Sequence, residues 1–256
     1  MKPDLAIHSS DSNPYYLDFW PLVSRIWKLK FGITPLLVYI DDNHDIPIDE
    51  TYGIVIKMKP IPDIPKYLQC LWVRYWIPSQ YPNKISILSD IDMFPISKRY
   101  FLSRIVSFPD DVYVHLNPAS TFPSCYHIAK GSLFKKVLDL PDKWEDSIRV
   151  LEAAAVHGDG HSIPGVDDPM TKWGWDEVYA TKKINGIADK SIFRMIPRLP
   201  SDNRLDRNEW RCNIEDLRNE MYVDCHSIRP YSEPANKLQI DLLIRIIMED
   251  KPSRLF

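Results

Sequence analysis

Residues 84–95, Lys-Ile-Ser-Ile-Leu-Ser-Asp-Ile-Asp-Met-Phe-Pro, decide the fold. Their first half is a short apolar run typical of a buried strand, and two aspartates, Asp90 and Asp92, follow where the run ends. Similar strand-like runs lie upstream, separated by segments with helical spacing, at residues 5–7, 35–40 and 53–56. Apolar runs that alternate with helices predict an α/β fold, in which helices flank a mostly parallel central sheet.

The remaining elements are predicted from the spacing of apolar residues and from turn signals. We expect further strands at residues 111–116 and 125–129, helices at 20–31, 62–78, 132–138, 144–156 and 175–184, a polar turn region at 223–234, and a closing amphipathic helix at 236–248. No repeat, low-complexity tract or linker interrupts the 256 residues. We therefore expect one domain, residues 1–256.

The composition argues against several classes of protein. The chain has 32 Lys and Arg against 35 Asp and Glu, and a net charge of −3 is too close to neutral for a protein whose main ligand is nucleic acid. The 8 glycines form neither G-x-G-x-x-G nor the P-loop pattern, which disfavours a standard dinucleotide-binding fold and a P-loop NTPase. The 4 cysteines include no C-x-x-C pair, as expected for free thiols in a reducing compartment. No run reaches the roughly 20 apolar residues of a transmembrane helix, and no signal-peptide core is found, so a cytoplasmic location is expected.

Polar residues follow three of the predicted strands, at residues 9–11, 41–42 and 90–92. In mostly parallel sheets, ligands bind in the crevice at the carboxyl ends of the strands, which is where these residues lie. Just beyond a strand, in a turn, the carboxylates of Asp90 and Asp92 can both approach one hard cation, directly or through water. The alternative is that one of these acids caps the next helix.

A strand that runs into Ser-Asp-Ile-Asp-Met-Phe-Pro resembles the D-x-D motif of nucleotide-sugar-dependent glycosyltransferases with the GT-A fold, which is related to the Rossmann fold. The resemblance covers roughly residues 4–230 in the order of elements. It implies that Asp90 and Asp92 bind Mn²⁺ or Mg²⁺, which bridges the diphosphate of the donor. It also implies a nucleotide-binding half at residues 1–100, an acceptor half at 101–235 and a closing helix at 236–256.

The same resemblance assigns residues on the donor side. The turn after the first strand is implied to receive the nucleotide through Ser9, Ser10 and Asp11. The helix before the D-x-D strand is implied to carry a basic residue that faces the donor, for which Arg74 is the first candidate and Lys66 the second. The alternative for Arg74 is a surface charge on an aromatic helix.

Residues 126–131 are implied to form a strand-to-helix turn beside the transferred sugar, where His127 would contact the acceptor. The glycine-bearing form of this turn that is usual in the family is only partly present.

Trp173-Gly174-Trp175-Asp176-Glu177 is the second marked feature. Two tryptophans around a glycine offer flat faces for stacking on sugar rings, and an acid at a helix start is stabilised as an anion by the helix dipole. Similar segments in GT-A enzymes line the acceptor site, which implies acceptor contacts for Trp173, Trp175 and Glu177 and a general-base role for Asp176. The alternative is a helix cap with tryptophans in the core.

His226 is the third feature, because GT-A enzymes use a late histidine to complete the metal site that the D-x-D begins. A neutral imidazole nitrogen is a suitable ligand for Mn²⁺. Arg229, three residues further on, is implied to bind the diphosphate and to assist its departure. The alternative for His226 is a structural role.

The sequence therefore predicts a metal-dependent glycosyltransferase, a hexosyl- or pentosyltransferase, that moves a sugar from a nucleoside-diphosphate sugar to a glycan or other hydroxyl acceptor. A UDP-sugar is the favoured donor. Two alternatives stay open. A sugar-phosphate nucleotidyltransferase usually has a glycine-rich loop after the first strand, which residues 8–12 do not provide. A catalytically silent nucleotide- or glycan-binding module would bind without turnover.

Overall fold

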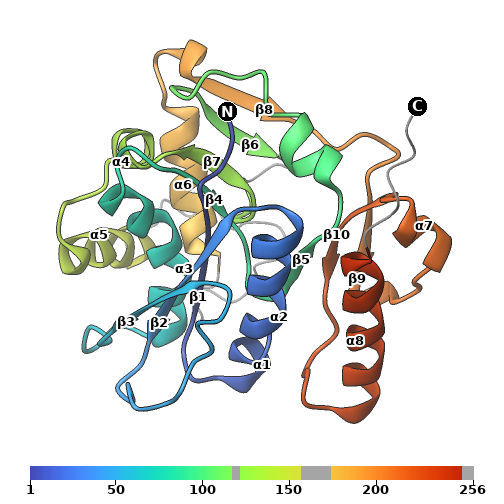
Figure 1. The fold of residues 1–256 in the computed structure, drawn as a ribbon. Coiled ribbons are helices and arrows are strands. Elements are labelled where there is room, and N and C mark those ends of the chain that lie inside the picture. Colours follow the sequence, from blue (N-terminus) through green and yellow to red (C-terminus); the bar gives the residue numbers. More distant parts are fainter. Residues whose placement is uncertain (117–121, 157–173, 250–256) are drawn as a thin grey trace.

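The computed structural model describes residues 1–116, 122–156 and 174–249, and its centre is a seven-stranded sheet (Figure 1). The strands of this sheet are β1 (Leu5–Ser10), β2 (Thr34–Ile40), β3 (Ile54–Met58), β4 (Ile85–Leu88), β6 (Tyr113–Leu116), β7 (His127–Lys130) and β8 (Phe193–Ile196). Their order is β3-β2-β1-β4-β7-β6-β8. The predicted α/β fold with a mostly parallel central sheet is therefore confirmed.

The direction of β7 decides what reaches the carboxyl end of β4. Strands β3, β2, β1 and β4 are mutually parallel, so the ends of β1 and β4 lie at the same edge of the sheet. Strand β7 is antiparallel to β4, and Ile85 at the start of β4 pairs with Lys130 at the end of β7. The start of β7, and not its end, therefore lies beside Asp90.

Helices cover both faces of the sheet, in two separate cores. The helical segments are α1 (Pro14–Leu17), α2 (Trp20–Arg25), η1 (Ile26–Lys30), α3 (Lys66–Trp76), η2 (Ile77–Gln80), η3 (Arg99–Ser103), α4 (Gly131–Leu138), α5 (Trp144–Val156), α6 (Trp175–Asn185), η4 (Lys190–Ile192), η5 (Arg207–Glu209), α7 (Ile214–Arg218) and α8 (Pro234–Met248). One core contains apolar side chains of α2, η1 and α8, and the other contains those of α3, α4, α5 and α6. Neighbouring residues of β1 alternate between them, since Ala6 belongs to the first core and Ile7 to the second.

A second, three-stranded sheet carries the residues that close the site from the C-terminal side. Its strands are β5 (Met93–Pro95), β9 (Asn203–Asp206) and β10 (Tyr222–His226), in the order β5-β10-β9. The prediction of a turn region from residue 223 is wrong for this stretch. The reason is that Asp224, a polar residue in the middle of β10, is fully buried and neutralised by two arginines, so the strand lacks an apolar pattern.

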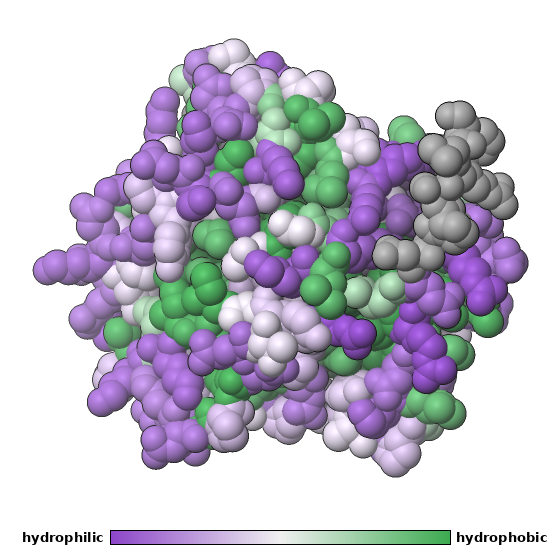
Figure 2. All heavy atoms as spheres, viewed as in Figure 1, coloured by the Kyte–Doolittle hydropathy of each residue, from purple (hydrophilic) through white to green (hydrophobic). Residues whose placement is uncertain are grey.

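The outer faces of the helices that cover the sheet are largely hydrophilic. Hydrophilic side chains dominate the left margin in Figure 2, where α4 and α5 lie in the same view of Figure 1. None of the described helices combines the length and hydrophobicity needed to cross a bilayer. The four cysteines are free, as expected.

Candidate active site

A pocket of about 500 Å³ lies at the carboxyl ends of β1 and β4. Its walls come from the end of β1, helix α3, the turn after β4, Ser124, the start of α6, η5 and the end of β10. The residues that line it are Ser9, Ser10, Asp11, Asn13, Tyr16, Tyr67, Cys70, Leu71, Arg74, Asp90, Ile91, Asp92, Ser124, Gly174, Asp176, Glu177, Arg207, Asn208, His226 and Arg229. Both carboxylates of the D-x-D motif thus face one pocket with most of the predicted site residues.

The backbone of the D-x-D turn is held from two sides. The Asp90 amide donates to Sγ of Cys125 at 3.4 Å, and the Ser227 amide, just after β10, donates to the Asp92 carbonyl at 3.0 Å. The turn therefore joins the start of the β7 segment to the end of β10. This arrangement is possible because β7 is antiparallel and brings Cys125 to the carboxyl end of β4.

One end of the pocket is a network of buried Arg74, Ser124 and Asp176 with the partly buried Asp90 and Glu177, here named the acidic end. The Arg74 guanidinium is 3 % exposed and forms ion pairs with Asp90 and, at 3.8 Å, with Asp176. The Ser124 hydroxyl donates to Asp176 at 3.1 Å and to Glu177 at 3.0 Å, and the Ser124 amide donates to Glu177. Asp176 itself is 1 % exposed, and its Oδ1 has no hydrogen-bond partner within the described ranges.

The local sequence explains how two adjacent acids reach this position. Gly174 caps α6 with φ 82°, in the left-handed region that glycine adopts without strain. The helix therefore begins at Trp175, and Asp176 and Glu177 fall in its first turn. Carboxylates at a helix N-terminus are favoured by the unpaired amides and the helix dipole.

Burial sets the protonation of the acidic end. Burial raises the pKa of Asp176 above its ordinary value, although Arg74 opposes the shift. Burial and the neighbouring Asp176 charge raise the pKa of Glu177 to about 7. Burial would also raise the pKa of Asp90, but the Arg74 guanidinium outweighs it and holds this pKa below its ordinary value. Two adjacent carboxyls with raised pKa values are groups that can exchange a proton near neutral pH.

The other end of the pocket contains Asp92, Arg207, His226 and Arg229, here named the arginine end. Asp92 Oδ2 lies 2.8 Å from Nη2 of Arg207, 3.5 Å from Nη1 of Arg229 and 3.8 Å from Nε2 of His226. The second ring nitrogen of His226 lies 3.3 Å from Asp206. Burial lowers the pKa of His226, so its imidazole is neutral at neutral pH.

The structure brings together ten of the thirteen predicted site residues. These are Ser9, Ser10, Asp11, Arg74, Asp90, Asp92, Asp176, Glu177, His226 and Arg229. Trp175 is part of α6 but does not line the pocket, and Trp173 lies outside the described residues.

His127 is not in the pocket. It is fully buried in the sheet, with its ring nitrogens 3.4 Å and 3.1 Å from the hydroxyls of Tyr75 and Tyr113. The junction of strand and helix in the predicted turn, at Lys130 and Gly131, lies at the opposite edge of the sheet, because β7 runs antiparallel to β4. The role assigned to His127 on that basis is therefore wrong, and Ser124 occupies the place that was expected for the turn.

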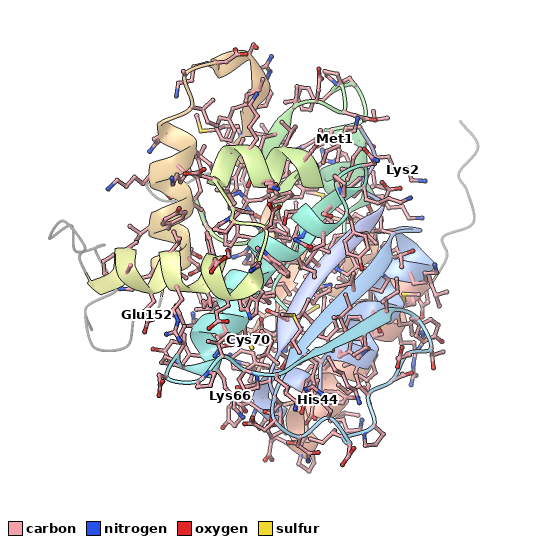
Figure 3. The ribbon with its side chains drawn as sticks, turned by 90° about the vertical axis from the view of Figure 1, so that its left-hand side faces the viewer. Met1, Lys2, His44, Lys66, Cys70 and Glu152 are labelled. Atoms are coloured by element: carbon pink, nitrogen blue, oxygen red, sulfur yellow. The ribbon has the colours of Figure 1, made fainter. Side chains whose placement is uncertain are left out.

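The geometry also places three further residues that the sequence analysis singled out. Arg74 is buried and is not a surface charge. Asp176 is linked to the D-x-D motif, because Arg74 contacts both Asp90 and Asp176. Lys66, at the start of α3 and one turn before Cys70 (Figure 3), pairs with Asp41 at 3.2 Å and does not line the pocket.

Sequence reasoning missed Ser124 and Arg207. Ser124 follows Pro123 in a segment with no recognisable motif, and it reaches the site through the reversed direction of β7. Arg207 belongs to a three-residue helix after β9, a strand that the sequence pattern does not reveal. No local signal marks either residue, since both depend on the pairing of distant strands.

The side chains expected to bind a divalent cation are of suitable chemical types. Asp92 and His226 are close together, and the Asp90 side chain, 39 % exposed, faces the same pocket. Carboxylate oxygens and a neutral imidazole nitrogen suit Mn²⁺. In the described parts of the chain, however, no three His, Cys, Asp or Glu side chains form a ready-made cluster, because Asp90 pairs with Arg74 and Asp92 with Arg207.

Several solved structures have a similar fold. The glycosyltransferase GlyE of Streptococcus pneumoniae TIGR4 is similar over 97 % of this chain, with 10 % identity and a TM-score of 0.52, and this chain spans 62 % of the GlyE chain. The galactosyltransferase LgtC, solved with donor and acceptor sugar analogs, is similar over 97 % of this chain and 98 % of its own, with 8 % identity and a TM-score of 0.51. No protein-family model matches the sequence, and comparison with curated protein sequences gives no match.

These likenesses define the class to which the fold belongs. The chain has the fold of glycosyltransferases of the GT-A type, which confirms at the level of the fold the resemblance inferred from the D-x-D segment.

Proposed function

We propose that this protein is a glycosyltransferase that moves a sugar from a nucleoside-diphosphate sugar, a UDP-sugar in particular, to a hydroxyl group of a glycan or other acceptor. One observation carries the proposal. Asp90 and Asp92 line the same pocket as the acids at the start of α6 and as His226 and Arg229 at the end of the chain's second sheet. Such a pocket offers cationic groups for a diphosphate and carboxylates for sugar hydroxyls within one volume of about 500 Å³.

The donor is proposed to bind along the carboxyl ends of β1 and β4. Ser9, Ser10 and Asp11 offer hydroxyl and carboxylate groups to the nucleoside, and Arg229 offers a guanidinium to the diphosphate. Arg229 also stacks over Tyr16 at 4.9 Å, which orients its planar group. The Arg74 side chain pairs with Asp90 and Asp176, so its proposed contribution is to hold Asp176 in place and to orient Asp90 before a cation binds.

Asp90, Asp92 and His226 are proposed to hold Mn²⁺ or Mg²⁺. Such a cation, when bound, neutralises negative charge that develops on the departing diphosphate. To hold a cation, the carboxylates of Asp90 and Asp92 would give up part of their pairing with Arg74 and Arg207. His226 is ready for this role, because its imidazole is neutral and its other nitrogen is oriented by Asp206.

The acidic end is proposed to serve the acceptor. Oδ1 of Asp176 has no partner among the described residues, while Oδ2 accepts from Ser124. Because Oδ1 is shielded from solvent, a substrate hydroxyl would have to displace neighbouring groups to reach it, but it would displace no existing hydrogen bond of Oδ1. Asp176 is the proposed general base if the anomeric configuration inverts, and it positions a substrate hydroxyl if the configuration is retained.

A screen of nucleotide sugars tests the proposal. The protein is incubated with a panel of UDP-, GDP- and ADP-sugars, with Mn²⁺ or with a chelator, and the release of nucleoside diphosphate and free sugar is measured. We expect slow hydrolysis of one donor that depends on the cation and is lost in Asp92→Asn. Release of pyrophosphate from a nucleoside triphosphate and a sugar phosphate would instead identify a nucleotidyltransferase, and binding with no turnover of any donor would contradict an enzymatic role.

A further inference from the structure

Arg207 is the pocket arginine that no sequence pattern anticipates. It follows β9 directly, in η5, and its side chain is 16 % exposed. Its Nη2 contacts Asp92 Oδ2 at 2.8 Å. Its Nε and Nη1 are shielded from solvent and have no hydrogen-bond partner in the portion of the chain that the structure describes.

Buried hydrogen-bond donors that have no acceptor destabilise the folded protein. A buried guanidinium N–H without an acceptor loses its hydration and gains nothing in return. Arg207 therefore has donor capacity beyond its contact with Asp92, at the wall of a pocket. An anion with several acceptor oxygens is the ligand that satisfies such a group.

The charges around Arg207 favour an anion as well. Two arginines, Arg207 and Arg229, and one carboxylate, Asp92, line this end of the pocket. Arg198, Arg204, Asp206 and Asp224 belong to the adjoining strands and loops and do not line it. Asp224 is shared by two of the arginines and Asp92 by the other two. Two guanidiniums therefore face one carboxylate at the surface of this end of the pocket.

We propose that Arg207 is an anion ligand of the pocket and binds a phosphate of the nucleoside diphosphate, opposite Arg229 across Asp92. This inference rests on the proposed function and names a residue of the same site. Asp92 positions Arg207 before the ligand arrives, through the contact at 2.8 Å. A planar guanidinium that is already oriented loses less conformational entropy on binding a phosphate than a mobile one.

Inorganic pyrophosphate in the presence of a chelator is the probe, because it carries the diphosphate without a nucleoside, a sugar or a cation. We expect calorimetry to show binding by the wild-type chain and at least a tenfold weaker affinity in Arg207→Gln. Arg211→Gln, an exposed arginine four residues further on that does not line the pocket, changes the net charge equally and should bind like the wild type.

Arg207→Lys covers the case in which the glutamine variant does not fold. It keeps the charge but lacks the fork of the guanidinium, so at least a threefold loss of pyrophosphate affinity is expected. A purely structural role would lower the melting temperature of Arg207→Gln and leave its pyrophosphate affinity unchanged, which overturns the proposal. Absence of pyrophosphate binding by the wild type, or wild-type affinity in Arg207→Lys, overturns it too.

The failure of this inference is distinguishable from the failure of the proposed function. UDP is titrated in the same series with Mn²⁺. If the wild type binds pyrophosphate through Arg207 but binds no nucleoside diphosphate, the anion site stands and the proposed function fails. If it binds UDP equally well with and without the Arg207 side chain, the proposed function stands and the assignment of Arg207 fails.

Discussion

The two ends of the pocket are built on the same D-x-D turn but differ in burial and in charge. At the acidic end, Arg74 and Asp176 are almost fully enclosed and fixed by contacts with Asp90 and Ser124. At the arginine end, His226 and Arg229 are about a quarter exposed, and their partner Asp92 is shared among several cations. A buried network resists rearrangement, whereas partly exposed ion pairs exchange partners at lower cost.

This difference separates the two tasks of a transferase. The arginine end has excess positive charge that a diphosphate can neutralise, and its exposed groups can turn to a ligand. The acidic end has a preorganised set of oxygen acceptors, with pKa values raised by burial, that suits hydroxyl groups and proton transfer. Variants at one end should therefore leave the task of the other end unchanged.

The largest effect is expected from Asp176→Asn. The amide keeps the shape of the side chain but removes the proton acceptor, so transfer should fall by roughly 10²–10⁴-fold, with donor affinity unchanged. Steady-state kinetics and UDP binding by calorimetry give the two measurements. A smaller loss that appears only as weaker acceptor affinity would indicate positioning and a retaining mechanism. If Asp176→Asn transfers sugar at the wild-type rate, the alternative holds, and residues 173–177 are a helix cap with tryptophans in the core.

Arg74→Met should have the next largest effect, and on stability. It leaves Asp90 and the buried Asp176 without their common counter-ion, and we expect the free energy of unfolding to fall by about 3 kcal/mol. Urea denaturation measures it. Arg99→Met is the matched control, because Arg99 is 55 % exposed and its partner Asp202 keeps Arg104, so a loss under about 1 kcal/mol is expected. Equal losses in both variants would mean that the acidic end is not a coupled buried network.

Asp92→Asn tests the arginine end. Calorimetry of UDP with Mn²⁺ should show about a 10–100-fold loss of affinity, because a charged ligand of the cation is removed. The loss in chelator should be smaller, because only the positioning of Arg207 is affected there. Asp111→Asn, an exposed aspartate that does not line the pocket, is the control. UDP binding that is the same with Mn²⁺ and with chelator in the wild type would refute the proposed cation site.

Glu177→Gln should have the smallest effect, visible in the pH dependence of stability. Burial raises the pKa of Glu177 from 4.5 to about 7, so the folded protein binds this proton more tightly than the unfolded chain. The free energy of unfolding therefore falls as pH rises from about 4.5 to about 7, by on the order of 1 kcal/mol. Melting temperatures between pH 5 and 8 should decline less in Glu177→Gln than in the wild type or in the control Glu209→Gln. Parallel curves for all three proteins would contradict a raised pKa of Glu177 in the folded protein.

The part of the molecule that could be predicted from sequence is the part set by local pattern. The apolar run before Asp90 and the helical spacing after Pro65 specify β4 and α3, and parallel pairing then places the ends of β1 and β4 together. Gly174 before two acids likewise predicts the start of α6 and the position of Asp176.

The part that could not be predicted depends on strand pairing across the chain. The reversed direction of β7 places Ser124 at the site and His127 in the core, and no periodicity distinguishes a parallel from an antiparallel strand of four residues. Strand β10 escapes notice because Asp224 interrupts its apolar pattern, although two arginines neutralise that residue in the fold. Arg207 is missed for the same reason, since it reaches Asp92 only through the pairing of β9 with β10.

The most direct test of the two-ended pocket is a crystal structure of the chain with Mn²⁺ and the UDP-sugar that the donor screen selects. The account predicts that the diphosphate lies within hydrogen-bonding distance of Arg207 and Arg229, with Mn²⁺ on Asp90, Asp92 and His226. It also predicts that the sugar lies against Asp176 and Glu177. A diphosphate bound at the acidic end, or a nucleotide bound outside the pocket, would contradict it.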